Sequence, residues 1–346
     1  MNILIIGGTG FIGQRLVKSL HASGETIHLL VRPSSLTKAQ KIFSNLENIY
    51  FLRGDIDQTD LLADVGQAEK VSEKIECVIH LAATYQLELS PSEAYLKNVI
   101  GTQNVLKFLN RLNHLKYFHY FSTYAVNQIL TGTILEDQLI SGNSYFYDEY
   151  ARSKNHAEHL VRKLAPKEIK TIIHRPGIII GDSKTGERDK NDGPYYFFDF
   201  IQKTRKFEIL TRKIKVLPLP VEEESLMPVL PVDRLINWCT KIILAPPSRA
   251  LSCYHLVPKN KILTKDFLQA SIVLLKSPLK IICVPLEKAF PVVFRFLSLP
   301  PQLVFYMKQT AQLDRKALDQ DYPDIEETSY RDYLPNIIQE FLNKKI

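Results

Sequence analysis

The sequence has 346 residues, 45% of them hydrophobic and 23% charged, proportions that predict a globular protein with a sizeable core. Its formal net charge of +7 suits an anionic ligand such as a phosphorylated cofactor, and the absence of a dense Lys/Arg run argues against nucleic acid. Four scattered cysteines are typical of neither a zinc site nor a disulfide scaffold, so no metal is expected. The chain starts directly with an apolar run and shows no charged leader, which favours a cytoplasmic protein.

Short apolar runs recur along the first half of the chain, with helical segments between them. They lie at Ile3–Ile6, Ile27–Val31, Ile49–Leu52, Cys77–Leu81, Tyr117–Ser122 and Thr171–His174. Strands that alternate with helices form a parallel sheet covered on both faces, because each crossover needs a helix to return the chain. The sequence therefore predicts an α/β fold with a doubly wound, Rossmann-type parallel sheet.

The first strand leads into a glycine-rich turn, "GGTGFIG", with Gly7, Gly10 and Gly13 at regular spacing. A helix is expected to begin near Phe11, and its first N–H groups and dipole favour a phosphate. Gly7 can make the tight turn, Gly10 can admit a pyrophosphate, and Gly13 can let the helix pack on the strand. Glycines alone also suit ordinary turns, but a strand before and a helix after them favour a dinucleotide site.

The end of the second strand indicates which dinucleotide is bound. The sequence there is "LLVRPSS", with Arg32, Ser34 and Ser35 and no acidic residue. An acid would accept hydrogen bonds from the adenosine ribose, whereas an Arg can pair with a 2′-phosphate. NADP(H) is therefore favoured over NAD(H), the alternative being that Arg32 merely faces solvent.

A second group of polar residues follows in "FHYFSTYAV" and "YDEYARSKNHAEHLVRKL". Tyr150 and Lys154 lie one turn apart in a predicted helix and so share one face. A neighbouring ammonium favours the phenolate, which would lower the Tyr150 pKa and allow proton exchange near neutral pH. Thr123, at the end of the preceding strand, can donate a hydrogen bond to a substrate oxygen. By spacing alone the pair could be an ordinary helix contact; its place beyond a strand end favours a site.

The composition changes after about Gly181, where a polar loop leads into an aromatic segment. We predict a cofactor domain over residues 1–180 and a smaller, mostly helical substrate lobe over residues 181–346, with some segments near 215–245 returning to the first domain. Short strands are expected in the lobe near Lys215–Leu217 and Tyr254–Leu256, and the last segment, Tyr330–Ile346, is expected to be an amphipathic helix.

One apolar segment, Ile281–Met307, contains charges and prolines and is too interrupted to span a bilayer. It is expected to form core and lid helices, and a membrane-surface or acyl-binding role is the alternative. His80 is interpreted as a hydrogen-bonded strand residue, Glu222–Glu224 as a solvated loop, and Asp233 as the cap of the helix that follows it.

Several motifs, in chain order, make the sequence resemble the extended short-chain dehydrogenases/reductases. They are "GGTGFIG" at Gly7–Gly13, "GDI" at Gly54–Ile56, "HLAA" at His80–Ala83, "NVIGTQNVL" at Asn98–Leu106, "ST" at Ser122–Thr123, "YARSK" at Tyr150–Lys154, "RPGIIIG" at Arg175–Gly181 and "PVDRLI" at Pro231–Ile236. The resemblance implies a Ser/Thr–Tyr–Lys centre and a nicotinamide cofactor.

By this resemblance Tyr150 is the general acid/base, Lys154 binds the nicotinamide ribose and lowers the Tyr pKa, and Thr123 orients the carbonyl, with Ser122 as the alternative. Asp55 and Ile56 would lie beside the adenine. The residues expected to contact or support the cofactor are Gly7, Thr9, Gly10, Phe11, Ile12, Gly13, Arg32, Ser35, Asp55, Ile56, Leu81, Ala82, Ala83, Asn98, Tyr150, Lys154, Pro176, Gly177 and Ile178.

Within that group the chain looks most similar to the male-sterility branch, which includes fatty acyl-CoA reductases and thioester-reductase domains. This similarity implies an NADP(H)-dependent oxidoreductase acting on a carbonyl or an acyl thioester, with a small-molecule substrate such as an acyl-CoA. A NAD-dependent nucleotide-sugar epimerase or dehydratase is the alternative, although "AVNQ" at Ala125–Gln128 replaces the usual "VYG" of the epimerases. A homodimer and a peripheral membrane contact are both compatible with the sequence.

Overall fold

The computed structural model describes residues 1–62, 65–85, 89–189, 191–204, 215–284 and 306–344, and its centre is a parallel sheet of seven strands. The strand order is β11-β7-β5-β4-β1-β2-β3, and every neighbouring pair is parallel. The strands are β1 (Asn2–Ile6), β2 (Thr26–Val31), β3 (Ile49–Arg53), β4 (Cys77–His80), β5 (Tyr117–Phe121), β7 (Lys170–Pro176) and β11 (Leu251–Leu256). The predicted doubly wound sheet is confirmed.

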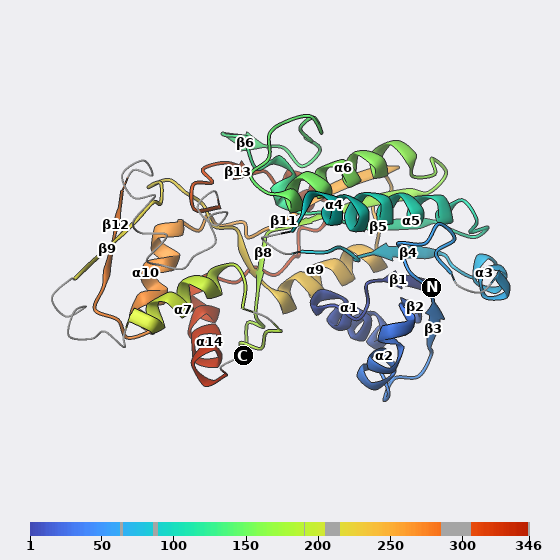
Figure 1. Cartoon of the computed structure of the whole chain (residues 1–346), viewed down its shortest axis with the longest axis horizontal. Helices are drawn as coiled ribbons and strands as arrows, with labels where there is room; N and C mark the ends of the chain where they lie inside the picture. Colours follow the sequence, from blue (N-terminus) through green and yellow to red (C-terminus); the bar gives the residue numbers. More distant parts are fainter. Residues whose placement is uncertain (63–64, 86–88, 190, 205–214, 285–305, 345–346) are drawn as a thin grey trace.

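Each face of the sheet is covered by its own layer of helices, as Figure 1 shows. In β1, Ile3 and Ile5 pack among α1 (Phe11–Ala22) and α9 (Val232–Leu244), whereas Leu4 and Ile6 pack on the opposite face. This alternation follows from the period of two in a strand, and burial on both faces explains the continuous apolar runs. The remaining covering helices are α2 (Leu36–Ile42), α3 (Val65–Ser72), α4 (Pro91–Ala94), α5 (Gly101–Leu109) and α6 (Glu149–Leu164).

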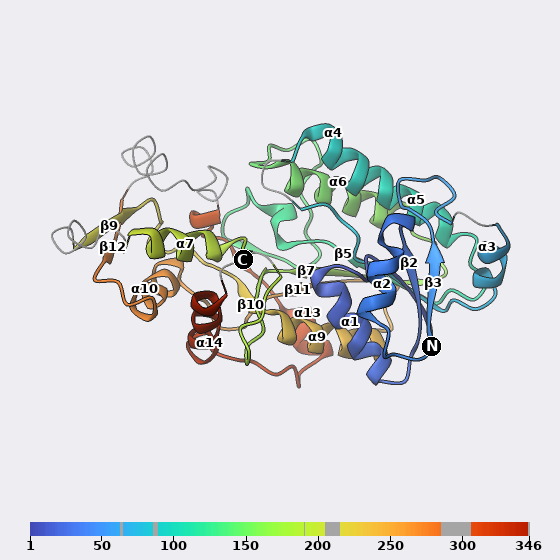
Figure 2. The ribbon, with the colours of Figure 1, turned by 60° about the horizontal axis from the view of Figure 1, so that its bottom comes forward.

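A smaller, mainly helical lobe lies at one end of the molecule, to the left in Figures 1 and 2. It contains α7 (Pro194–Thr204), α10 (Thr264–Leu274), α14 (Tyr330–Asn343) and the parallel pair β9 (Val216–Leu219) and β12 (Lys280–Cys283). Its core is rich in aromatic rings, and Phe198 packs edge-on against Tyr195 and Phe341. The expected C-terminal amphipathic helix is α14.

The strand expected at Tyr254–Leu256 does not belong to the lobe. β11 pairs with β7 along its whole length, so it forms the edge of the main sheet. Segments near 215–245 are expected from the sequence to return to the cofactor domain, and α9, which lies in this range, does pack on α1. The division of the chain at residue 180 stays a prediction.

The expected capping role of Asp233 is wrong. The N-cap of α9 is Pro231, and the helix begins at Val232, so Asp233 already lies in its first turn. Its two carboxylate oxygens instead accept hydrogen bonds from the backbone N–H of Ser183 (2.8 Å) and from the Ser183 hydroxyl (2.6 Å). Asp233 therefore tethers the loop that follows β8 (Ile178–Ile180), a strand paired with β10 (Val229–Pro231).

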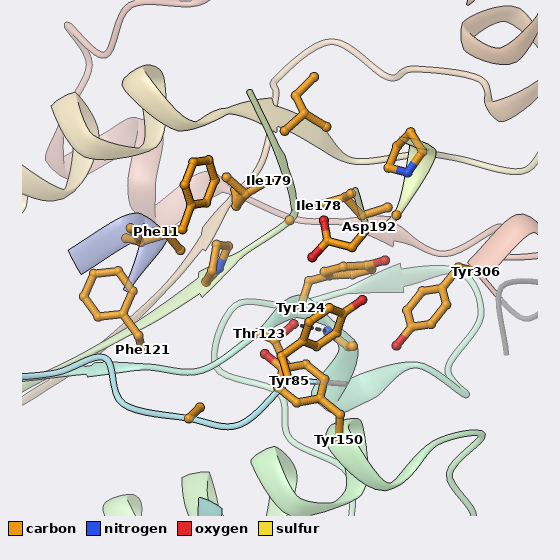
Figure 3. A pocket seen from close by; sticks show the side chains of 18 of the residues that line it. Phe11, Tyr85, Phe121, Thr123, Tyr124, Tyr150, Ile178, Ile179, Asp192 and Tyr306 are labelled. Carbon is orange, nitrogen blue, oxygen red and sulfur yellow. Dashed lines mark hydrogen bonds between the residues drawn. The ribbon is translucent and has the colours of Figure 1, made fainter. Parts of the chain in front are cut away.

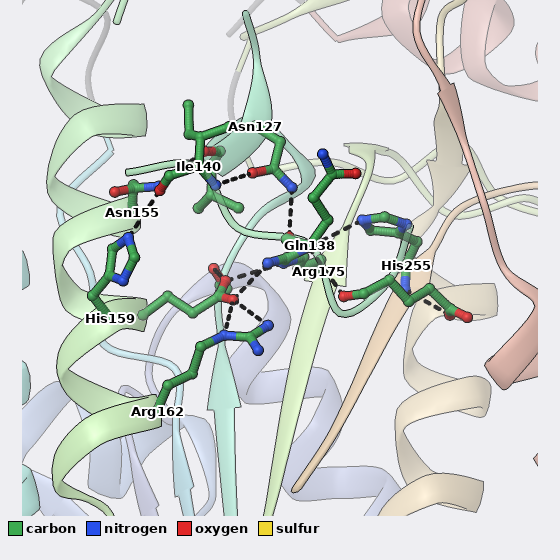
Figure 4. A network of polar contacts seen from close by, with 12 residues as sticks. Asn127, Gln138, Ile140, Asn155, His159, Arg162, Arg175 and His255 are labelled. Atoms are coloured by element: carbon green, nitrogen blue, oxygen red, sulfur yellow. Dashed lines mark hydrogen bonds and ion pairs between the residues drawn. The ribbon is translucent and has the colours of Figure 1, made fainter. Parts of the chain in front are cut away.

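A buried ion pair holds α6 against the sheet (Figure 4). Glu158 and Arg175 both have fully buried side chains, and Arg175 Nη2 donates to Glu158 Oε1 at 2.6 Å. Arg162 Nε donates to the same oxygen at 3.0 Å, and the Ser122 hydroxyl donates to Oε2 at 2.6 Å. Burial alone would raise the pKa of Glu158, but the charges of Arg175 and Arg162 and the hydrogen bonds from Arg175 and Ser122 outweigh it and lower the pKa to about 2.

The same guanidinium extends the network to the edge of the sheet. Arg175 Nη1 donates to the Glu136 carbonyl oxygen at 3.1 Å and contacts His255 Nε2 at 3.3 Å. The Glu136 carboxylate accepts from the backbone N–H groups of His255 (3.1 Å) and Ala317 (2.6 Å). The network thus joins α6, β7, β11 and α13 (Lys316–Asp321) and fixes Ser122 just beyond the end of β5.

We expect the substitution Glu158→Gln to lower the free energy of unfolding by about 3–5 kcal/mol, because it leaves the buried Arg175 charge without its partner. Urea denaturation measures the change. The control is Asp60→Asn, which breaks an ion pair between side chains that are 72% and 54% exposed, Asp60 and Arg111, and should cost less than about 1 kcal/mol. Equal effects of the two substitutions would contradict the stabilising role of Glu158.

Candidate active site

The glycine-rich turn has a backbone that side chains would obstruct. Gly7 has φ +94°, and a Cβ there would lie 2.6 Å from the Ala82 nitrogen. A Cβ on Gly13 would lie 2.3 Å from the Gly7 carbonyl oxygen, so Gly13 lets α1 pack on the turn. Gly10 is the N-cap of α1 and has no side chain to cap the helix. The first N–H groups of α1 are therefore available to a ligand, as an anion site requires.

A cavity of about 400 Å³ runs from this turn to the helical lobe, a volume typical of a small-molecule site. Its lining includes the turn, the ends of β4 and β5, the first turns of α6, and the lobe. Of the residues predicted from the sequence, Gly7, Gly10, Phe11, Ile12, Gly13, Leu81, Ala83, Ser122, Thr123, Tyr150, Lys154, Pro176, Gly177 and Ile178 border it.

The predicted helix that carries Tyr150 and Lys154 is α6, whose N-cap is Asp148. Lys154 is 2% exposed, its Nζ donates to the Phe121 carbonyl oxygen at 2.5 Å, and it lies 4.4 Å from the centre of the Tyr120 ring. Both contacts lie at the end of β5, and Lys154 borders the cavity there. Figure 3 shows Tyr85, Tyr124 and Tyr150 gathered around Thr123.

The pKa shifts of this pair differ from the sequence-based expectation. Burial, and secondly the charge of Asp148, raise the pKa of Tyr150, while a hydrogen bond with Thr123 acts in the opposite direction. Burial lowers the pKa of Lys154 to about 7, against the charge of Glu158. The expected lowering of the Tyr150 pKa is therefore wrong, because desolvation by burial dominates. The phenol is held in its protonated, proton-donating form.

The two neighbouring hydroxyls at the end of β5 have different partners. The Ser122 hydroxyl donates to the buried Glu158 carboxylate at 2.6 Å. The Thr123 hydroxyl accepts from the backbone N–H of Ala125 at 3.3 Å and is a partner of the Tyr150 phenol. Its own proton can still be donated to a substrate oxygen. These contacts favour Thr123 over Ser122 as the substrate-facing hydroxyl.

Asn98 holds two sides of the site together from a π-helical segment, η2 (Tyr95–Ile100). Its Oδ1 accepts from the Thr84 backbone N–H at 2.8 Å, and its Nδ2 donates to the Thr84 carbonyl oxygen (3.1 Å) and to the Ser153 hydroxyl (2.9 Å). Tyr85 follows Thr84, and its ring meets the Tyr150 ring edge-on with centroids 4.8 Å apart. Asn98 therefore supports the site from beneath rather than bordering the cavity.

The other predicted cofactor residues lie near the carboxyl ends of neighbouring strands, outside the cavity lining. They are Thr9 after β1, Arg32 and Ser35 after β2, Asp55 and Ile56 after β3, and Ala82 after β4. Arg32 is exposed and directly follows β2, and its guanidinium has no hydrogen-bond partner among the residues that the structure describes. Its guanidinium is therefore accessible to an anionic ligand.

Several cavity residues were not singled out from the sequence. Tyr85 lies close in sequence to "HLAA" and Tyr124 directly follows Thr123, so their proximity to predicted residues is a usable signal. Others come from distant segments, and no local pattern marks them. They are Met227 and Leu268, whereas Asp192, Tyr195 and Phe197 belong to the polar loop and aromatic segment noted after Gly181. Tyr306 and Met307 end the apolar segment Ile281–Met307, of which residues 285–305 lie outside the described part of the chain.

The residues given structural interpretations behave accordingly. His80 Nε2 contacts the Thr102 hydroxyl at 3.1 Å inside the core, and Glu222–Glu224 are exposed. Among the described residues no group of three His, Cys, Asp or Glu side chains is arranged to hold a metal ion. None of the helices in the described ranges has both the length and the apolar character needed to cross a bilayer.

The sheet, the glycine turn and the Tyr–Lys helix define the class: an NAD(P)-binding protein of the extended short-chain dehydrogenase/reductase type. The family model described as male sterility protein matches residues 5–239, and the chain belongs to that family.

The relatives of this chain include proteins named as reductases and proteins named as nonribosomal peptide synthetases. The chain is 25% identical over 240 residues to the NRPS-like oxidoreductase fscA of Fusarium equiseti, which covers 64% of this chain and 23% of that protein. It is 29% identical over 288 residues to the aldehyde reductase lnbA of Aspergillus flavus, which covers 76% of this chain and 27% of that protein. The chain thus spans about a quarter of the length of these curated relatives.

Solved structures show the same fold. The terminal R domain of the myxalamid PKS-NRPS pathway superimposes with a TM-score of 0.77 at 23% identity, covering 99% of this chain and 90% of that one. MoeE5, solved in complex with UDP-glucuronic acid and NAD, superimposes with a TM-score of 0.66 at 16% identity, covering 99% of both chains. At these identities the likeness concerns the fold.

Proposed function

We propose that this protein is an NADPH-dependent reductase of a carbonyl or acyl-thioester substrate, with Tyr150 as the general acid. The observation that carries the proposal is the single cavity that borders the glycine turn, Thr123, Tyr150 and Lys154, and also the apolar lobe. A dinucleotide lying on the turn and a substrate lying in the lobe would then meet beside the phenol.

The residues present fit a nicotinamide dinucleotide. Gly7, Gly10 and Gly13 carry no side chains in the glycine turn, which leaves the backbone and the helix N-terminus open to a pyrophosphate. The space beside Gly10 is open, because a Cβ built there would lie 3.4 Å from its nearest neighbour, the Gly7 carbonyl oxygen. The bound cofactor supplies the hydride. Lys154, buried beside the end of β5, is placed to hold the ribose hydroxyls next to the ring.

The chain's own groups then handle the proton and the developing charge. Thr123 would donate a hydrogen bond to the carbonyl oxygen, and Tyr150 would donate its proton to that oxygen as negative charge develops on it. The raised Tyr150 pKa keeps the phenol protonated for this step. Preorganised donors at a water-poor site supply transition-state stabilisation without rearrangement.

The substrate end of the cavity favours an apolar acyl group. Phe197, Met227, Leu268 and Met307 border it, and the lining of the whole cavity is mainly apolar. The relatives named above as an NRPS-like oxidoreductase and an aldehyde reductase agree with thioester or aldehyde chemistry. An acyl-CoA or a carrier-bound thioester is therefore the substrate class we propose.

The cytoplasmic location and the homodimer expected from the sequence stay predictions.

The substitution Tyr150→Phe should lower kcat by about two to four orders of magnitude, because it removes the proton donor, while NADPH binding is retained. NADPH oxidation and NADPH fluorescence titration measure the two effects. The control is Tyr145→Phe, which alters a 64% exposed tyrosine in the loop before α6 and should leave both unchanged. Activity of Tyr150→Phe at the parent level would refute the acid role.

The substitution Arg32→Ala should raise the Kd for NADPH by about ten- to a hundredfold, because a charge-assisted contact to the 2′-phosphate is lost. The Kd for NADH should stay nearly constant, since NADH lacks that phosphate. Fluorescence titration with both cofactors measures the ratio. An equal loss for NADPH and NADH would show that Arg32 does not read the phosphate.

A substrate panel separates the reductase from the epimerase or dehydratase alternative. We expect NADPH oxidation with decanoyl-CoA or decanal and none with UDP-glucose, because the lobe end of the cavity is apolar. The identity of any cofactor that copurifies is determined in parallel by mass spectrometry. Tightly bound NAD⁺ together with turnover of a nucleotide sugar would overturn the reductase proposal.

A further inference from the structure

Asp148 is a buried carboxylate at the helix end that carries Tyr150, and the reaction steps above leave it without a role. It is the N-cap of α6 and 8% exposed. Its Oδ1 accepts from the Ala151 backbone N–H at 2.7 Å, which fixes the first turn of the helix. Tyr150 belongs to that turn, so its position depends on this cap.

The second carboxylate oxygen of Asp148 connects the helix to the cavity wall. Oδ2 accepts from the Tyr306 hydroxyl at 2.8 Å and from Gln128 Nε2 at 3.2 Å. Gln128 Oε1 in turn accepts from the Tyr147 backbone N–H at 3.0 Å, so the residues preceding the helix are held as well. Burial raises the pKa of Asp148, and the hydrogen bonds that Ala151, Tyr306 and Gln128 donate to the carboxylate act in the opposite direction, toward its ionised form.

The phenols that act on or contact Asp148 border the cavity, and Figure 3 shows four of them, Tyr85, Tyr124, Tyr150 and Tyr306, on one side of it. After burial, the charge of Asp148 is among the influences that raise the pKa values of Tyr85, Tyr124, Tyr150 and Tyr306. The titratable groups facing Tyr150 and Asp148 from the surrounding elements are Tyr85, Tyr120, Tyr124, Lys154, Asp192 and Tyr306.

We propose that Asp148 is a positioning residue of this enzyme: it caps the helix turn that carries Tyr150, ties that turn to Tyr306 in the substrate wall, and keeps the Tyr150 phenol protonated. The inference rests on the proposed function, because only an acid role for Tyr150 makes its protonation matter. The proposed role goes beyond helix capping, because Ser, Thr or Asn would also cap the helix but would place no negative charge beside the phenol.

The sign of the effect follows from the charges. A carboxylate beside a phenol disfavours the phenolate, so replacing Asp148 by a neutral residue lowers the Tyr150 pKa. Reduction needs the protonated phenol, and its rate declines as pH rises through that pKa. The alkaline limb of the log(kcat/KM) profile should therefore move to lower pH, by about one unit for a single neighbouring charge.

The test is the pH profile of NADPH oxidation by Asp148→Asn, with decanoyl-CoA or decanal, whichever the parent turns over. Asparagine keeps the cap, so we expect a folded enzyme whose alkaline limb lies about one pH unit lower than that of the parent. At pH values above the alkaline limbs of both enzymes, its kcat/KM should be about tenfold lower than that of the parent. The control is Glu149→Gln, which removes the neighbouring carboxylate in the sequence. The Glu149 carboxylate is paired with the exposed guanidinium of Arg152, with 3.3 Å between Oε1 and Nη1. The profile of Glu149→Gln should match the parent's.

A second variant, Tyr306→Phe, keeps the ring but removes one donor to Asp148. The carboxylate charge is then less compensated, so the alkaline limb should stay in place or move to higher pH. An unmoved limb in Asp148→Asn, or the same downward movement in Tyr306→Phe, would overturn the inference, because loosened packing rather than charge would explain it. Turnover of neither substrate, or a fully active Tyr150→Phe, would overturn the proposed function itself.

Discussion

The position of α6 against the carboxyl end of β5 is the constraint on which the site depends. Lys154 reaches the Phe121 carbonyl, Glu158 receives the Ser122 hydroxyl, and Ser153 receives the Asn98 amide. Each contact is buried, so each would leave an unsatisfied polar group if the helix moved. Because the strands are parallel, this edge of the sheet is also where the glycine turn lies, and the two halves of the site meet there.

Burial sets the electrostatics of the site more than the Tyr–Lys pairing does. Desolvation raises the pKa of Tyr150 and lowers the pKa of Lys154 to about 7, so both groups are driven toward their neutral forms. A neutral phenol is a proton donor, which agrees with the proposed reduction. The nearby carboxylate of Asp148 acts in the same sense on the phenol.

The sequence predicted the sheet because buried parallel strands are continuous apolar runs, and it predicted the turn because glycine spacing follows from backbone contacts. It failed where a segment's partner decides its role. The run at Tyr254–Leu256 is a strand wherever it lies, and only its pairing with β7 assigns it to the main sheet. Asp233 is a residue type that often caps helices, yet the helix begins at Val232, two residues earlier than a cap at Asp233 would require, and Ser183 donates hydrogen bonds to the carboxylate instead.

By itself the sequence determined the fold class, the glycine turn and the helix that presents Tyr150 and Lys154, since each depends on residues near one another in the chain. Only the tertiary structure decided the cavity wall, where Met227 and Leu268 come from segments with no local signature. It also decided the direction of the pKa shifts, because desolvation depends on everything packed around a group. Local patterns encode backbone geometry; burial is a property of the whole fold.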